Sequence, residues 1–122
     1  MGRRSGWNSR FGEAAERHAA ALLCAAGLTL LCRRYRVRGG EIDLVALDGD
    51  TLVFVEVKAR RSRRFGVPGE AVTFHKQRRL VAAARTYLRE HPHRGPCRFD
   101  VIAIESTRGT AAARWLRDAF TV

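Results

Sequence analysis

The sequence predicts a single α/β domain over residues 1–122, built on a mixed sheet with the element order α-β-β-β-α-β and room for one more strand. Three observations support this fold class. The length of 122 residues is typical of one domain. With 46% hydrophobic residues, the chain can bury a core and is not intrinsically disordered. Segments with helical apolar spacing alternate with segments of strand-like composition, which indicates both helices and strands.

The first helix is expected before Gly27. Residues 1–8 are basic and contain glycine, and we expect them to be flexible. Asn8 or Ser9 can cap the helix, and Gly27 would end it. The positions expected to face the core are Phe11, Ala15, Ala19, Leu22 and Ala26.

Three strands are predicted next, over residues 28–37, 41–47 and 51–59. Turns that contain glycine, at 38–40 and 48–50, separate them, so the strands are expected to form an antiparallel meander. The third segment is almost continuously apolar. This composition is typical of a central strand that is buried on both faces.

A second helix and a fourth strand follow. Thr73 is the expected helix cap, and the His-Pro pair at 91–92 is expected to end the helix. The apolar stripe of this helix comprises Leu80, Val81, Ala84 and Leu88. The strand over 99–104 follows the third strand through a helical crossover, so the two are expected to be parallel. In the tail over 111–122 we expect a short edge strand around Trp115 and a last turn of helix.

The charge of the chain points to an anionic partner. The sequence has 23 Lys or Arg against 12 Asp or Glu, which gives a formal net charge of +11. All but two of the cations are Arg, whose planar guanidinium binds phosphate through two N–H groups. Nucleic acid is therefore the first partner to expect. Codon usage in a GC-rich genome could explain the ratio of Arg to Lys, but not the excess of positive charge.

Cysteine usage favours a reducing cytoplasm. The three cysteines, Cys24, Cys32 and Cys97, form no CxxC pair, and their odd number fits no closed set of disulfides. Cys24 and Cys32 lie in apolar runs, where free cysteine is expected to pack as a small hydrophobic residue. The apolar run over 19–32 is 14 residues long, which is too short for a membrane span.

Charged residues stand at unexpected positions in the third predicted strand. Glu56 and Lys58 share one face of it, because strand side chains repeat every two residues. Ionised groups in a buried strand are costly unless they are paired or functional. An ion pair between the two residues at an exposed strand end is the alternative explanation.

Asp43 in the preceding strand is expected to lie almost opposite Glu56. Counted from Gly49, Asp43 lies six residues back and Glu56 seven forward, a mismatch that one turn or bulge residue would absorb. Two facing carboxylates repel each other unless a cation lies between them. Oxygen ligands favour a hard ion such as Mg²⁺, or Mn²⁺. Lys58 could then orient a water molecule or stabilise the charge of a phosphoryl transition state.

Asp43 and the later Glu56-Val57-Lys58 segment together resemble the D…(D/E)xK signature of the PD-(D/E)xK nuclease superfamily. That superfamily has a restriction-endonuclease-like fold, a three-layer core with the order α-β-β-β-α-β. The segments RGGEIDLV (38–45), VFVEVK (53–58) and RFDV (98–101) are similar to the YraN-type proteins. These small bacterial proteins are related to archaeal Holliday-junction resolvases and are predicted to be nucleases.

The resemblance implies a role for each matching residue. Asp43 and Glu56 would be metal ligands together with the carbonyl oxygen of Val57, and Lys58 would be the catalytic lysine. Glu13 matches an acidic residue that junction resolvases place beside the metal site. Among these motifs, one position departs from the pattern: an isoleucine, Ile42, stands where the superfamily's namesake proline would be.

Three further candidates for the catalytic site each leave a structural alternative open. Gln77 matches a polar position on the second helix of several superfamily members, but it could instead satisfy a buried backbone group. Glu13 could simply favour the helix dipole. Glu41 lies on the same strand face as Asp43 and is either a further metal or water contact or a surface acid beside the turn.

Basic residues near this site are expected to contact the nucleic-acid backbone, namely Arg38, Arg60, Arg61, Lys76 and Arg79. Arg78, Arg85 and Arg89 are expected on the opposite, solvated face of the second helix, without a role. The sequence has no helix-turn-helix, zinc-finger or recognisable base-stacking motif, so we expect backbone or shape recognition, as of a branched DNA.

The sequence thus predicts a Mg²⁺-dependent endonuclease that hydrolyses phosphodiester bonds of DNA, with branched or junction DNA as one option. The alternatives are a nucleic-acid-binding module that retains the fold without turnover, and an RNA-associated accessory protein. We expect a cytoplasmic location and no membrane partner, and either a monomer or a homodimer.

Overall fold

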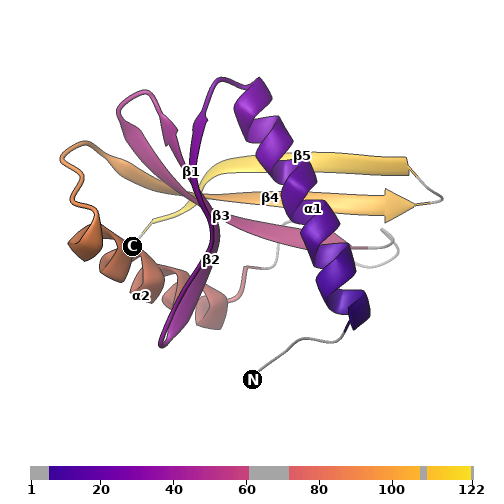
Figure 1. The fold of residues 1–122 in the computed structure, drawn as a ribbon, viewed down its shortest axis with the longest axis horizontal. Helices are drawn as coiled ribbons and strands as arrows, with labels where there is room; N and C mark the ends of the chain where they lie inside the picture. Colours follow the sequence, from indigo (N-terminus) through magenta and orange to yellow (C-terminus); the bar gives the residue numbers. More distant parts are fainter. Residues whose placement is uncertain (1–5, 61–71, 108–109, 122) are drawn as a thin grey trace.

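The computed structural model describes residues 6–60, 72–107 and 110–121. In chain order they form α1 (Gly6–Ala25), β1 (Thr29–Val37), β2 (Gly40–Asp48), β3 (Thr51–Arg60), α2 (Phe74–Glu90), β4 (Cys97–Thr107) and β5 (Thr110–Phe120) (Figure 1). The predicted α/β class and the order α-β-β-β-α-β, with the further strand, are confirmed.

The five strands belong to one mixed sheet in the order β1-β2-β3-β4-β5. β1, β2 and β3 are antiparallel neighbours, as the glycine turns predicted. The chain then crosses over through α2, so β4 pairs with β3 in parallel, and β5 returns antiparallel to β4. β3 is therefore a central strand, and its residues from Leu52 to Glu56 are all buried.

The helices cover different faces of the sheet, and each has its own hydrophobic core. The core beneath α1 comprises Ala15, Ala19, Leu23, Leu28, Leu44, Ala46, Val53, Val55, Ile102 and Ile104. The core beneath α2 comprises Ile42, Val45, Leu52, Phe54, Leu80, Ala83, Ala84, Tyr87 and Phe99. Alternate residues of β3 enter alternate cores, which gives the three-layer arrangement of helix, sheet and helix.

The first helix begins earlier than expected. α1 starts at Gly6, so neither Asn8 nor Ser9 is its cap, and only residues 1–5 of the segment expected to be flexible lie outside the described residues. Ala15 and Ala19 are buried as predicted, but Ala26 is exposed.

The end of α1 explains why Ala26 leaves the core. Gly27 adopts a φ of 94°. This left-handed conformation allows the N–H of Leu28 to donate a hydrogen bond to the carbonyl of Leu23 at 3.0 Å. This turn ends the helix, so the last core contact comes from Leu23, while Leu22 is partly buried beside it. The predicted core position Phe11 has no described side chain.

The second helix agrees closely with the sequence. The Thr73 side chain accepts a hydrogen bond from the N–H of Lys76 at 3.1 Å and thereby caps α2. The helix ends before His91, as predicted. Leu80 and Ala84 are buried, with Val81 and Leu88 partly buried against the same core.

The C-terminal segment is an edge strand that contains Trp115, as predicted, but it is longer than expected and the predicted last turn of helix is wrong. β5 pairs with β4 from Thr110 opposite Thr107 to Phe120 opposite Phe99. The open edge of β4 offers backbone partners along its whole length, and these outweigh the weak helical preference of the tail. An irregularity is accommodated at Asp118, which has a φ of 52° and donates its N–H to Asp100.

Asp100 is structural, as expected. Its side chain is fully buried, and it accepts hydrogen bonds from Arg98, from the indole of Trp115 and from the backbone of Asp118. Cys24, in contrast to the prediction, is exposed, because it lies on the side of α1 away from Leu23. Neither of the described helices is long and apolar enough to cross a membrane.

Candidate active site

The β2–β3 hairpin brings Asp43 and Glu56 to the same point of the sheet. Asp48 pairs with Thr51, so the turn has two residues and the register runs without a slip to Leu44 opposite Val55. Asp43 and Glu56 are the next residues on the two strands. The mismatch of one residue counted from Gly49 disappears because the turn is centred between Gly49 and Asp50.

Asp43 lies directly beyond the last residue pair of the β2–β3 ladder, Leu44 and Val55. Its Oδ2 atom accepts a hydrogen bond from the N–H of Val57 at 2.8 Å, in place of a backbone bond between the strands. Burial, followed by the nearby charge of Glu56, raises the pKa of Asp43 from 3.8 to about 8, although the Val57 hydrogen bond opposes this. The site therefore holds a carboxyl group that lacks a sufficient counter-charge.

Glu56 has a cationic partner from the second helix. Its side chain is 8% exposed, and its Oε2 atom accepts a hydrogen bond from the Nζ atom of Lys76 at 3.0 Å. Burial lowers the pKa of Lys76, but the hydrogen bond to Glu56 and the charges of Glu56, Asp43 and Glu41 together raise it by more, so the ammonium group stays charged. The first turn of α2 thus neutralises one of the two carboxylates and leaves the other.

Arg34 in β1 lies opposite Asp43 but does not pair with it. Its neighbours in the ladder, Arg33 and Tyr35, pair with Leu44 and Ile42. Arg34 adopts a φ of 54°, a left-handed conformation that costs a side-chain-bearing residue about 1–2 kcal/mol. Its guanidinium bonds instead to two acids of α1, Glu13 and Glu16.

Glu16 is the acid of α1 whose charge affects the pKa of Asp43, and it was not among the residues predicted from the sequence. Glu13, the predicted one, forms an ion pair with Arg34 at 3.2 Å, and Glu16 bonds the same guanidinium at 2.8 Å. Of these two acids, Glu16 contributes to the raised pKa of Asp43. The sequence signal for Glu16 was its position directly after Ala15, a residue that faces the core.

Glu41 and Gln77 each form a contact with a residue other than Asp43 and Glu56. Glu41 forms an ion pair with Arg36 at 3.4 Å, and its charge also raises the pKa of Asp43. The Nε2 atom of Gln77 donates to the carbonyl of Val72 at 3.1 Å. This is the backbone-satisfying contact that was the structural alternative for Gln77.

Lys58 lies two residues after Glu56 on β3 and is half-buried. Alternation along the strand puts both side chains on the face that α2 covers. Glu56 bonds Lys76 of α2, so an ion pair with Lys58 is not needed to explain the buried glutamate. Lys76 was predicted as a nucleic-acid contact, and its pairing with Glu56 was not predicted, although its helical register with Leu80 and Ala84 points it toward the sheet.

Known proteins are similar to this chain over the segment that contains the site. The profile described as "Uncharacterised protein family UPF0102" matches residues 15–104. The chain belongs to the UPF0102 family. A UPF0102 protein of Symbiobacterium thermophilum is 52% identical over 113 residues, which cover 91% of this chain and 96% of the relative. A UPF0102 protein of Ralstonia nicotianae is 54% identical over 116 residues, covering 91% and 86%.

Membership of UPF0102 confirms the YraN-type resemblance. The matched segment contains the two carboxylates, Lys58, Lys76 and the α1 acid Glu16. It ends before β5, so the C-terminal strand of this UPF0102 protein lies outside the match.

The residues of this site suit a hard cation that needs only a few protein ligands. Among the described residues, no group of three or more His, Cys, Asp or Glu is arranged to hold a metal ion. Mg²⁺ commonly uses one or two carboxylates and keeps several waters. Asp43 and Glu56, with the Val57 carbonyl on the same strand, fit that sparse set, and the raised pKa of Asp43 indicates a missing positive charge.

Of the residues predicted to contact nucleic acid, Arg38 and Arg79 are exposed and Lys76 belongs to the site itself. The turn that carries Arg38 lies against α2, because Gly40 packs directly on the backbone of Arg79 (Figure 1). Arg60 is half-buried at the end of β3. Arg61 lies outside the described residues.

Proposed function

We propose that this UPF0102 protein is a Mg²⁺-dependent endonuclease that hydrolyses phosphodiester bonds of DNA. The observation that carries the proposal is the adjacent pair Asp43 and Glu56, in which burial and mutual repulsion raise the pKa of Asp43 to about 8. A protein gains nothing in stability from such a pair, so a cation that relieves the repulsion is its natural ligand.

In this proposal each residue of the site has a distinct role. Asp43, Glu56 and the Val57 carbonyl would hold Mg²⁺, which when bound neutralises phosphate charge and makes a water molecule more acidic. Lys58 extends from the same face of β3 and would stabilise the negative charge that grows on the phosphate in the transition state. Lys76 holds Glu56 in position through the 3.0 Å contact.

Charge supports nucleic acid as the substrate. The net charge of +11 favours association with a polyanion, and Arg38 and Arg79 stand exposed on neighbouring elements that adjoin the site. The described residues contain no recognition helix of known DNA-binding type, so contacts to the phosphate backbone fit better than base-specific readout. Branched DNA is one substrate that such recognition can select.

The test is a cleavage assay on labelled duplex, flap, four-way-junction and RNA substrates, with Mg²⁺, Mn²⁺ or EDTA. We expect metal-dependent cleavage of DNA that is lost in Asp43→Asn and in Glu56→Gln. Asp50→Asn, a charge-matched change at the exposed β2–β3 turn, should cleave normally. Undiminished cleavage by both site variants would refute the two-carboxylate site.

A second function, a nucleic-acid-binding module without turnover, is favoured by one contact. Lys76 already neutralises Glu56, as a metal ion would, at 3.0 Å. Calorimetry distinguishes the two functions, because a pure binding module should take up neither Mg²⁺ nor Mn²⁺ at this site. Binding of metal by the wild type but not by Asp43→Asn would favour the nuclease.

A further inference from the structure

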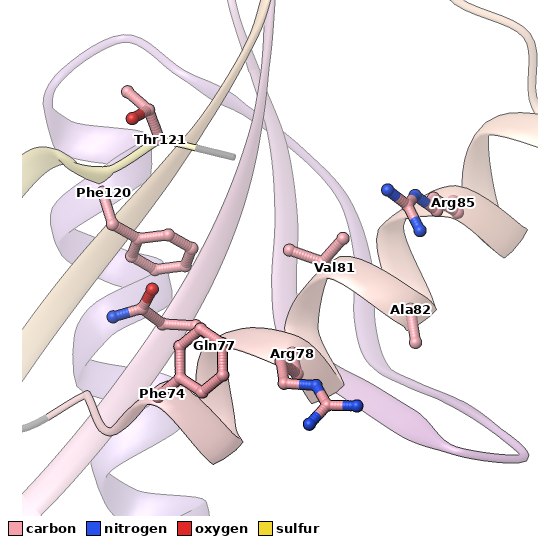
Figure 2. A pocket seen from close by; sticks show the side chains of 8 residues that line it. All are labelled: Phe74, Gln77, Arg78, Val81, Ala82, Arg85, Phe120 and Thr121. Carbon is pink, nitrogen blue, oxygen red and sulfur yellow. The ribbon is translucent and has the colours of Figure 1, made fainter.

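A pocket opens between α2 and the end of β5, on the other side of the first turn of α2 from Glu56. Its volume is about 490 Å³, within the usual range for sites of small ligands. The residues that line it are Phe74, Gln77, Arg78, Val81, Ala82, Arg85, Phe120 and Thr121 (Figure 2). It is distinct from the carboxylate pair, of which no member lines it.

An exposed aromatic ring stands at the mouth of this pocket. Phe74 is 73% exposed, the more exposed of the two large hydrophobic side chains on the described surface. The ring of Phe120 is held from behind by a stacked contact with Phe99, at 4.9 Å between ring centroids. Figure 2 shows the rings of Phe74 and Phe120 on either side of Gln77. A flat aromatic ligand could therefore stack here at little cost in reorganisation.

The same pocket is positively charged. The guanidinium of Arg78 lies 5.8 Å from the centre of the Phe74 ring, and Arg85 follows two turns later along α2 (Figure 2). None of the lining residues is acidic. The expectation that Arg78 and Arg85 have no role, as part of a merely solvated face, is therefore unsupported, since both border a cavity.

We propose that this pocket binds an unpaired nucleobase of a DNA strand, which stacks against Phe74 while neighbouring phosphates contact Arg78 and Arg85. An aromatic face beside two arginines matches the alternation of bases and phosphates along a single strand. An apolar peptide would leave the two guanidinium groups without partners, and a duplex hides the faces of its bases.

This inference rests on the proposed function and specifies its substrate. Phe74 and Lys76, the partner of Glu56, both lie in the first turn of α2, but their side chains leave the helix on nearly opposite sides, because two residues correspond to a rotation of about 200°. A strand whose base occupies the pocket would therefore reach the carboxylate pair by passing around this turn. The substrate class is DNA with an unpaired segment next to the bond that is cut, such as a flap or the branch of a junction, in preference to blunt duplex.

The first experiment measures binding with EDTA present, so that it is independent of catalysis. A single-stranded oligonucleotide that contains one 2-aminopurine reports stacking by loss of its fluorescence. Phe74→Ala should weaken binding about tenfold, the size expected from loss of one base–aromatic stack, and should abolish the fluorescence change. Phe74→Trp should retain both, and binding of blunt duplex should change less than about twofold in either variant.

The control for lost apolar surface is Leu31→Ala, which alters the other exposed large hydrophobic residue, on β1. It should bind the oligonucleotide as the wild type does. Equal weakening by Phe74→Ala and Leu31→Ala, or equal loss of duplex and single-strand binding, would overturn the proposal. Binding of a free mononucleotide as tightly as the oligonucleotide would also overturn it, because the pocket would then be a nucleotide site.

The second experiment tests the arginines through salt dependence. Each phosphate contact on a single strand contributes about 0.7 to the slope of log affinity against log salt. The double variant Arg78→Gln with Arg85→Gln should lower the slope by about 1.4, whereas Arg89→Gln, on the same helix outside the pocket, should leave it unchanged. An unchanged slope in the double variant would overturn the phosphate contacts.

Failure of this inference can be told from failure of the nuclease proposal. Asp43→Asn should keep the stacking signal in EDTA even though it loses cleavage. If stacking occurs but no substrate is cut, the pocket stands and the nuclease is refuted. If DNA is cut but Phe74→Ala cleaves flap and blunt duplex in the same ratio as the wild type, the nuclease stands and the pocket is refuted.

Discussion

Replacing Asp43 by Asn should stabilise the protein at alkaline pH. The pKa of Asp43 is about 8 in the folded protein, because of burial and then of Glu56, against 3.8 for an ordinary aspartate. Between these two values the unfolded chain has released a proton that the folded protein retains. The free energy of unfolding therefore falls as the pH rises from about 4 to 8, and this loss is absent below the lower value.

The magnitude follows from the two pKa values. At about 1.4 kcal/mol per pH unit, the difference between 3.8 and about 8 sets an upper limit of roughly 6 kcal/mol. The carboxyl group is only half-buried, and water reaching it reduces this. Asparagine can still accept the hydrogen bond from Val57. We expect Asp43→Asn to raise the free energy of unfolding by about 2–3 kcal/mol at pH 8 and by little at pH 5.

The assay is urea unfolding followed by circular dichroism in EDTA, across this pH range. Because histidines also titrate there, the informative quantity is the difference between wild type and variant at each pH. Asp50→Asn, at the exposed hairpin turn, is the charge-matched control and should give a difference near zero. Adding Mg²⁺ at pH 8 should stabilise the wild type and leave Asp43→Asn unchanged.

A flat difference curve for Asp43→Asn would refute this prediction, because it would mean that the half-buried carboxylate already has enough compensating positive charge or hydrogen bonding. Glu56→Gln provides the cross-check. It removes the neighbouring charge, so the pKa of Asp43 should fall, and the pH dependence of the variant should be shallower than that of the wild type.

Four other outcomes are expected. Lys58→Ala should slow single-turnover cleavage about 100-fold with little change in DNA affinity, because its charge acts in the transition state. DNA affinity should fall steeply with salt in a filter-binding assay, whereas a flat dependence would show that the net charge of +11 has no part in binding. Asp100→Ala should cost about 3–5 kcal/mol in thermal or urea unfolding, because it removes a fully buried carboxylate that bonds the partly buried Arg98, the indole of Trp115 and the backbone of Asp118. Asp48→Ala, at the more exposed partner of Arg98, should cost less than about 1 kcal/mol. Gly40→Ala should destabilise by about 1–3 kcal/mol because its Cβ would meet the backbone of α2, while Gly12→Ala, which meets nothing, should be neutral or stabilising.

The sequence by itself determined the order of the elements and the pairing of the two carboxylates. Both depend on local rules: the turn signal at 48–50 fixes the hairpin register to within one residue, and the two-residue turn at Gly49 and Asp50 then places Asp43 opposite Glu56. The cap at Thr73 and the end of α1 at Gly27 are equally local, because they involve hydrogen bonds within one turn.

Contacts between elements were decided only by the tertiary structure. The pairing of Lys76 with Glu56 and the proximity of Glu16, in place of Glu13, to Asp43 depend on how each helix is rotated and shifted on the sheet. The apolar stripe fixes the rotation of a helix only approximately, and it does not fix its position along the strands, which packing of side chains determines.

The pocket beside Phe74 shows the same limit. Its walls come from α2 and from the end of β5, and the sequence predicted the latter as a turn of helix. Phe120 reaches the pocket because β5 follows the full edge of β4, where backbone hydrogen bonds to a long neighbouring strand outweigh local preference. Sequence periodicity identifies which residues leave the core, but only the packed elements decide which of those residues meet around a cavity.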